Sequence, residues 1–157
     1  MPDWIVHVLI GLILIEIFNL KPKSLVLIGV LLPDALIKLE LFHVMFPFPK
    51  YLFMWLFQPL HAPIGMALFT VLMLPFFKYN KAKTYGLLAV GWISHLVFDL
   101  TGRHLMQGQN LLLFPFSWVN IELGWVWADE FYKADAVFLV IFLAVIWYNE
   151  CFKRQKS

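Results

Sequence analysis

Long runs of apolar residues alternate with short polar stretches along almost the whole chain. Each run is about 16 to 19 residues long, close to the length that a helix needs to cross a bilayer. Short polar turns separate the runs, such as the one that contains Lys21, Pro22 and Lys23. This pattern predicts an all-α fold, a polytopic membrane bundle with about five transmembrane helices. The expected spans are residues 4–20, 24–42, 62–77, 84–100 and 134–152.

Two stretches do not fit a span. Residues 47–61 are rich in proline and aromatic side chains, and residues 101–133 mix polar groups with tryptophan and phenylalanine. Tyrosine and tryptophan favour the membrane–water boundary, so we expect interfacial aromatic loops here. No internal repeat divides the chain, which predicts one domain over residues 1–157. Residues 1–3 lack the basic start of a signal peptide, so we expect the first apolar run to be mature structure.

The composition agrees with a membrane protein and narrows its chemistry. The 157 residues are 62% hydrophobic and 14% charged, with a mean hydropathy of +0.79. The single cysteine, Cys151, excludes an internal disulfide and a paired-cysteine metal knuckle, so a metal would need histidine and carboxylate ligands. Basic residues form short clusters without a face of interleaved aromatics, so nucleic acid is not an expected partner.

The basic clusters also predict an orientation. In a five-span topology eight basic residues fall on one side of the membrane: Lys21, Lys23, Lys78, Lys81, Lys83, Lys153, Arg154 and Lys156. Cytoplasmic loops are enriched in lysine and arginine. We therefore expect a multi-pass protein of the inner (cytoplasmic) cell membrane, with its N-terminus outside and its C-terminus in the cytoplasm.

The clearest chemical signal is a histidine and an aspartate four residues apart in the fourth apolar run. On a helix this spacing places His95 and Asp99 on one face, about one turn apart, where they can bind the same metal ion. A hydrogen-bonded structural pair is the alternative, and we favour the metal. The predicted topology places His7, Asp34 and His61 on the same outer side of the membrane.

Asp34 strengthens this hypothesis more than the other two. A carboxylate inside a membrane span costs about 2.5–3.5 kcal/mol on insertion scales and commonly marks a functional site. Pro33 precedes it and would free backbone carbonyls. For His7 or His61 taken alone, an interfacial hydrogen bond is the simpler interpretation.

Five elements of the chain together resemble a known family. They are His7, the Leu-Leu-Pro-Asp of 31–34, His61, the Ser-His-Leu-Val-Phe-Asp-Leu-Thr of 94–101 and the Leu-Leu-Phe-Pro-Phe of 112–116. The set resembles the membrane-bound metal-dependent hydrolases described as LexA-binding and inner-membrane-associated. The order of ligands is also similar to that of zinc-dependent phospholipase C. That similarity implies one zinc held by Asp34, His61, His95 and Asp99, and a second metal near His7 that Asp99 also reaches, with His104 as a further ligand.

These observations predict hydrolysis of an ester or phosphoester bond in an amphiphilic, lipid-like substrate by metal-activated water. The cofactor would be one or two divalent ions, zinc or else manganese. Asp34 or Asp99 would orient the water or accept its proton, and Arg103 would contact a phosphate. Two alternatives stay open: a non-enzymatic metal-binding membrane protein with a regulatory or structural role, and a small ion transporter. The sequence predicts neither the oligomeric state nor a LexA-type partner.

Overall fold

The computed structural model describes residues 4–38, 58–103, 110–127 and 130–155. Within these ranges the chain forms α1 (Trp4–Phe18), α2 (Lys23–Lys38), α5 (Pro63–Met73), α6 (Lys81–Thr101) and α7 (Phe131–Gln155). Two 3-10 helices flank α5, η2 (Gln58–His61) and η3 (Leu74–Phe76). The parallel strands β1 (Gly102–Arg103) and β2 (Val126–Trp127) pair Gly102 with Val126 and Arg103 with Trp127. The predicted all-α class is confirmed for the described residues.

Local sequence signals explain where the helices begin and end. Helix α1 stops at Asn19, which has a φ of 49°, and the Leu20 N–H donates to the Ile15 carbonyl at 3.1 Å. A left-handed residue followed by such a bond is a common way to end a helix. Helix α6 begins after Asn80, whose side-chain oxygen accepts from the Lys83 N–H at 3.1 Å. The polar turns between the apolar runs therefore act as helix boundaries.

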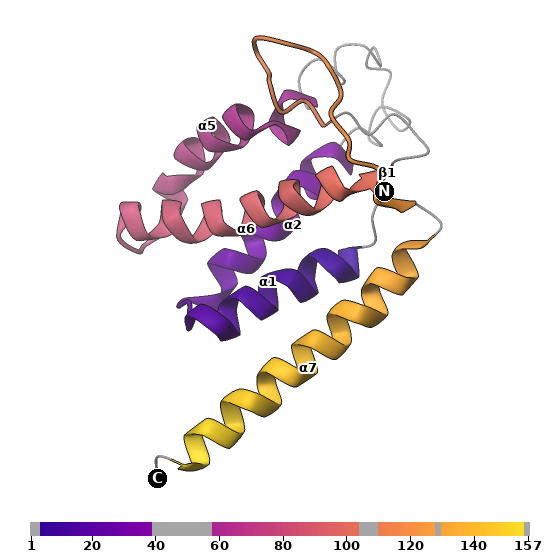
Figure 1. Cartoon of the computed structure of the whole chain (residues 1–157). Coiled ribbons are helices and arrows are strands. Elements are labelled where there is room, and N and C mark those ends of the chain that lie inside the picture. The colour runs from indigo at the N-terminus through magenta and orange to yellow at the C-terminus, as the bar shows by residue number, and fades with distance from the viewer. Residues whose placement is uncertain (1–3, 39–57, 104–109, 128–129, 156–157) are drawn as a thin grey trace.

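Helix α6 lies at the centre of the bundle (Figure 1), packed against α2, with α5 on one side and α1 on the other. Helix α7 runs along α1 at the edge. Three clusters of buried apolar side chains hold these layers together. The first joins α1, α2 and α6 through Ile15, Leu25, Val26, Leu87 and Leu88. The second joins α5 to α6 through Met66, Ala89, Trp92 and Leu96, and the third joins α1, α6 and α7 around Val6 and Phe98.

Two glycines allow α2 and α6 to approach until their backbones touch. A Cβ atom on Gly29 would lie 2.2 Å from the Leu88 carbonyl oxygen, and one on Gly91 would lie 2.3 Å from that of Val26. Small residues at helix contacts are typical of membrane bundles, where they let the helix backbones approach closely. This contact sets the distance between the side chains that α2 and α6 carry.

The prediction of about five spans is corrected by the helix lengths. Among the described residues one helical segment, Tyr132–Phe152, is long and apolar enough to cross a membrane, with a mean hydropathy of 1.7. Helices α1 and α5 are apolar but have only 15 and 11 residues. Helix α2 has 16 residues and contains Pro33 and Asp34. Helix α6 has 21 residues, and its lysines, histidine and aspartate lower its apolar character.

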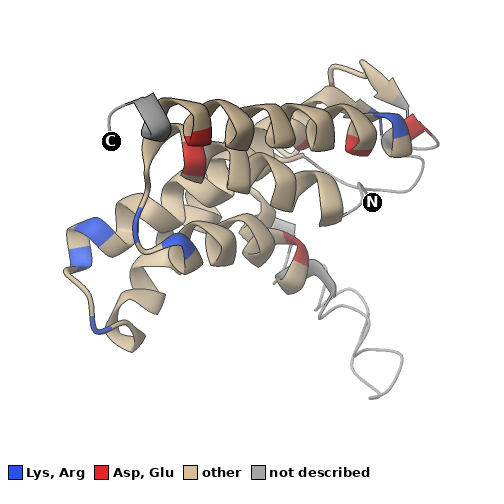
Figure 2. Cartoon of the chain, turned by 90° about the horizontal axis from the view of Figure 1, so that it is seen from below, with Lys and Arg blue, Asp and Glu red and all other residues tan. Residues whose placement is uncertain are grey.

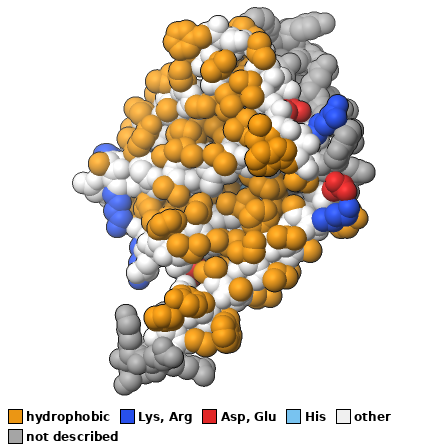
Figure 3. All heavy atoms as spheres, in the orientation of Figure 1, with side chains coloured by type: hydrophobic (Ala, Val, Ile, Leu, Met, Phe, Trp, Pro, Cys, Tyr) orange, Lys and Arg blue, Asp and Glu red, His pale blue; other side chains and the backbone are white. Residues whose placement is uncertain are grey.

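Charged side chains gather towards the ends of the helices. In Figure 2 most basic segments lie at the end of the molecule where the C-terminus is found. The face in Figure 3 is covered by hydrophobic side chains between two charged borders. Large apolar side chains on α7 and around α5 are well exposed, for example Leu68 at 63%, Leu72 at 69% and Trp147 at 70%. Continuous exposed apolar surface of this kind marks a contact with lipid or with another protein.

Candidate metal centre

Five histidine and aspartate side chains meet where α1, α2, η2 and α6 converge. The relative exposure is 1% for His7, 3% for Asp34, 6% for His61, 1% for His95 and 2% for Asp99. Helix α6 supplies the last two residues, and each of the other three elements supplies one. Ionisable groups are almost never this buried without partners, so this cluster needs a specific explanation.

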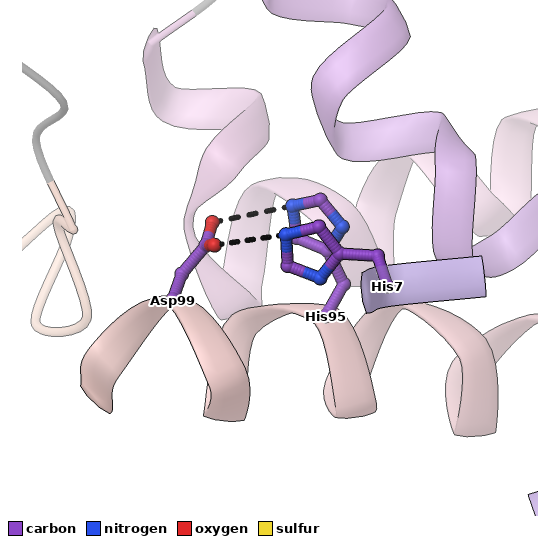
Figure 4. Close-up of side chains that lie close together, drawn as sticks. All are labelled: His7, His95 and Asp99. Carbon is purple, nitrogen blue, oxygen red and sulfur yellow. Dashed lines mark ion pairs between the residues drawn. The ribbon is translucent and has the colours of Figure 1, made fainter. Parts of the chain in front are cut away.

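Asp99 is the hub of the cluster, because three imidazoles face its carboxylate. Oδ2 lies 3.2 Å from Nε2 of His61 and 3.2 Å from Nε2 of His95. Oδ1 lies 3.2 Å from Nε2 of His7. Figure 4 shows His7 and His95 side by side, each facing a different oxygen of Asp99. One oxygen of Asp99 thus faces the His7 nitrogen, and the other faces the nitrogens of His61 and His95.

The distances among these atoms fit a metal-ligand set. Nε2 of His61 and Nε2 of His95 are also 3.2 Å apart, so these two nitrogens and Oδ2 of Asp99 form a nearly equilateral triangle. Ligands of a tetrahedral zinc with bonds of about 2.0–2.1 Å are separated by about 3.3–3.4 Å. Oδ1 of Asp34 lies 3.8 Å from Nε2 of His95, close enough to be a fourth ligand.

Two overlapping groups of ligand atoms satisfy the spacing of a metal site. One is His7, His95 and Asp99, and the other is Asp34, His61 and His95, with all atoms in a group within 4.8 Å of one another. These buried groups could hold a metal ion. Two histidines with carboxylates suit zinc, although the donor types alone do not select the metal.

Unsatisfied polar atoms favour a metal over a purely hydrogen-bonded cluster. Within the described residues no hydrogen-bond partner is found for Nδ1 of His7, Nδ1 of His95 or Oδ2 of Asp34, and Nε2 of His7 and Oδ1 of Asp99 face each other as an ion pair at 3.2 Å. A buried polar atom without a partner costs about 1–3 kcal/mol. A cation near the Nε2 and carboxylate atoms would remove that cost for Oδ2 of Asp34.

Aromatic packing fixes the histidine rings. The rings of His7 and His95 stack with centroids 3.9 Å apart and planes 15° apart. Phe98 meets His7 edge to face at 5.3 Å, and Phe138 of α7 meets Phe98 in the same way at 5.6 Å. Helix α7 therefore supports the centre indirectly, through the phenylalanine that holds the His7 ring.

A close contact at the start of α5 places His61. A Cβ atom on Gly65 would lie 1.8 Å from the Pro59 carbonyl oxygen, so η2 folds directly onto the first turn of α5. The Ala62 N–H donates to the same carbonyl at 3.1 Å. This tight turn directs the last residue of η2 towards α6.

The structure brings together five of the six predicted ligands, His7, Asp34, His61, His95 and Asp99, and the sixth, His104, lies outside the described residues. Arg103, the predicted phosphate contact, is exposed on β1, directly after the end of α6. Its side chain runs beside Gly124, which has a φ of 66°. Its role towards a substrate stays a prediction.

Asn110 bonds to the backbone of a residue of the centre, and no sequence pattern predicted a role for it. It is 3% exposed, and its side-chain amide donates to the backbone carbonyl of Asp99 at 3.0 Å. The only signal along the chain is a polar residue directly before the apolar run 111–114. That signal does not identify a partner.

Comparisons with known proteins add no relative. No family model matches the chain, and no curated protein or solved structure matches it significantly. The chemistry of the centre is therefore argued from its own residues.

Proposed function

We propose that this chain is a membrane-embedded, metal-dependent hydrolase that cleaves an ester or phosphoester bond of an amphiphilic, lipid-like substrate. The observation that carries the proposal is the buried group of three imidazoles and two carboxylates with metal-ligand spacing. The short-motif resemblance to membrane-bound metal-dependent hydrolases supports the same function.

The residues divide into two groups by the atoms that they present. Asp34, His61, His95 and Asp99 would hold one ion, and His7 with the second oxygen of Asp99 would hold another. A bound divalent ion such as zinc supplies Lewis acidity and water that ionises near neutral pH. The buried rings keep their nitrogens on the carboxylate, and the surrounding apolar side chains exclude bulk water.

Asp34 is the carboxylate best suited to orient the attacking water. Its Oδ2 has no hydrogen-bond partner among the described residues, whereas both oxygens of Asp99 face imidazoles at 3.2 Å. A carboxylate with a free oxygen can accept a proton from water as the bond to the substrate forms. Asp99 is then the residue that positions the histidines.

The exposed surface supports a location in the membrane. Helix α7 can cross a bilayer by length and composition, and none of its most apolar window is buried inside the protein. The other helices present apolar side chains on the same face (Figure 3), so we propose that they too lie in the membrane. Shorter helices can be accommodated there by local thinning of the bilayer. The lysine-rich turns would be cytoplasmic, and the centre would lie near the outer surface.

One observation favours a second candidate function. The side chains of the centre are 1–6% exposed, and closed metal sites are typical of structural rather than catalytic metals. A non-enzymatic metal-binding membrane protein would therefore use the same residues. The two functions differ in turnover, not in metal content.

The test measures metal content and hydrolysis on the detergent-purified full-length chain. We expect stoichiometric metal in the wild type and its loss in Asp99→Asn, a change that keeps the shape and removes the charge. Glu16→Gln is the matched control, since Glu16 pairs with Lys23 away from the centre. Zinc- or manganese-loaded wild type should release product from vesicles of phospholipid or lipid phosphate. Metal without turnover would favour the non-enzymatic function, and equal metal in Asp99→Asn and the control would refute the centre itself.

A further inference from the structure

Asn110 connects the centre to the segment that follows α6. Its side-chain Nδ2 donates to the Asp99 carbonyl at 3.0 Å, its backbone N–H donates to Oδ1 of Asn120 at 2.6 Å, and its carbonyl accepts from the Ile121 N–H at 3.2 Å. The residue is therefore held by its own segment while its amide reaches the helix. Such a buried amide, bonded on both sides, forms a rigid connection.

The same segment continues along the end of α6. The last carbonyls of a helix have no partners within the helix and must be satisfied from outside. Here the Leu123 N–H donates to the Leu100 carbonyl and the Trp125 N–H to the Thr101 carbonyl, both at 2.8 Å. The pairing of β1 with β2 then extends this contact beyond the helix. At the start of this series the Asp99 carbonyl accepts from the Gly102 N–H at the C-cap, and the Asn110 side chain is a second donor to it.

The position of Asp99 makes this bond important. Helix α6 ends at Thr101, so Asp99 lies in its last turn, where helices fray most easily. Its two carboxylate oxygens must face different histidines at 3.2 Å, and a small rotation of the turn would spoil both contacts.

We propose that Asn110 is a positioning residue of the metal centre. By holding the Asp99 carbonyl it fixes the last turn of α6, so that both carboxylate oxygens stay on their imidazole partners. The inference rests on the proposed metal centre. Outer groups that orient metal ligands change metal affinity by about 10- to 100-fold when they are removed. Since Asn110 acts through the backbone of a ligand, we expect a loss of roughly tenfold.

The test uses Co²⁺ alone as the probe, titrated into metal-free, full-length protein in detergent. Its visible absorption reports the geometry of the ligands as well as the affinity. Asn110→Leu keeps the branching at Cγ and removes the amide, and it should weaken Co²⁺ binding roughly tenfold and alter the spectrum. Asn149→Ala is the matched control. Asn149 also donates an amide bond to a backbone carbonyl, that of Glu16 at 3.2 Å, between α7 and α1.

A second variant covers the case in which Asn110→Leu does not fold. Asn120 is exposed, and Asn120→Ala removes the acceptor of the Asn110 backbone N–H together with an exposed bond to Oε1 of Glu122, so it should shift Co²⁺ affinity in the same direction by a smaller factor. Unchanged affinity and spectrum in the folded Asn110 and Asn120 variants, relative to Asn149→Ala, would overturn the role of Asn110 and leave the centre intact. Wild-type protein that binds no Co²⁺ would overturn the centre and this inference together.

Discussion

Gly91 offers the sharpest test of the packing that assembles the centre. In Gly91→Ala the new methyl group would lie 2.3 Å from the Val26 carbonyl oxygen and 2.6 Å from the Val30 nitrogen. Both are backbone atoms of α2, so no side-chain rotation can relieve the contact. An ordinary contact begins at 3.4 Å, so α2 and α6 must separate by about 1 Å.

This separation should affect both stability and metal binding. Overpacking of this kind costs about 1–3 kcal/mol of unfolding free energy. Asp34 on α2 lies 3.8 Å from His95 on α6, and a further 1 Å or so would take it out of ligand range. We therefore expect Gly91→Ala to lower the thermal midpoint in detergent and to weaken Zn²⁺ binding measured by competition with a chelator.

Gly86→Ala is the matched control on the same helix. In the described part of the chain no atom outside the helix lies within 4 Å of a Cβ atom at Gly86, and the position is exposed. Alanine there should be neutral or raise stability by about 0.5–1 kcal/mol through helix propensity, with Zn²⁺ affinity unchanged. If Gly91→Ala were as stable as Gly86→Ala and bound Zn²⁺ equally well, the close approach of α2 and α6 would be refuted.

Four further substitutions test other parts of the structure. His95→Ala removes the ring that contacts both Asp34 and Asp99, and it should weaken metal binding more than about 100-fold. His7→Ala should remove only part of the bound metal, because His7 contacts only the second oxygen of Asp99. Equal losses of metal in the two variants would contradict the division of the ligands into two groups. Gly65→Ala would displace η2 and should lower metal affinity by moving His61, and normal affinity in that variant would argue against the tight turn. Leu143→Arg on exposed α7 should raise the free energy of inserting this helix by about 2.5–3.5 kcal/mol if Leu143 lies at the bilayer centre. The fraction of protein that resists alkaline extraction from membranes should then fall, and an unchanged fraction would argue against α7 as a span.

The helices and the candidate ligands could be predicted from local patterns, for physical reasons. Apolar runs bounded by polar turns specify helices without reference to the rest of the fold, and a four-residue spacing places His95 and Asp99 together on any helix. The five-span topology that placed His7 and His61 on the same side as this pair is not supported by the helix lengths, but the structure does bring these residues together. Their role as ligands stays a prediction.

Other features depend on contacts between distant segments and had no local signal. Gly29 and Gly91 look like ordinary glycines in apolar runs until their helices meet. Asn110 is one polar residue among many in its stretch, and its bond to Asp99 exists only because the segment folds back on α6. The number of spans was overestimated because an apolar run does not show how many of its residues the helix contains, and α1 and α5 are short.

The arrangement of ligands explains why α6 is the organising element. It contributes His95 and Asp99, and its glycine contact with α2 brings Asp34 to them. The other two histidines come from α1 and η2, which are separated from α6 along the chain by other elements. A bound ion would thus join four separately packed elements, and its binding energy would add to the stability of the folded bundle. Without an ion the same place would concentrate buried polar atoms that lack partners. The centre is therefore the candidate site of chemistry and also a junction of four elements, where a bound ion would make the helices hold together more firmly.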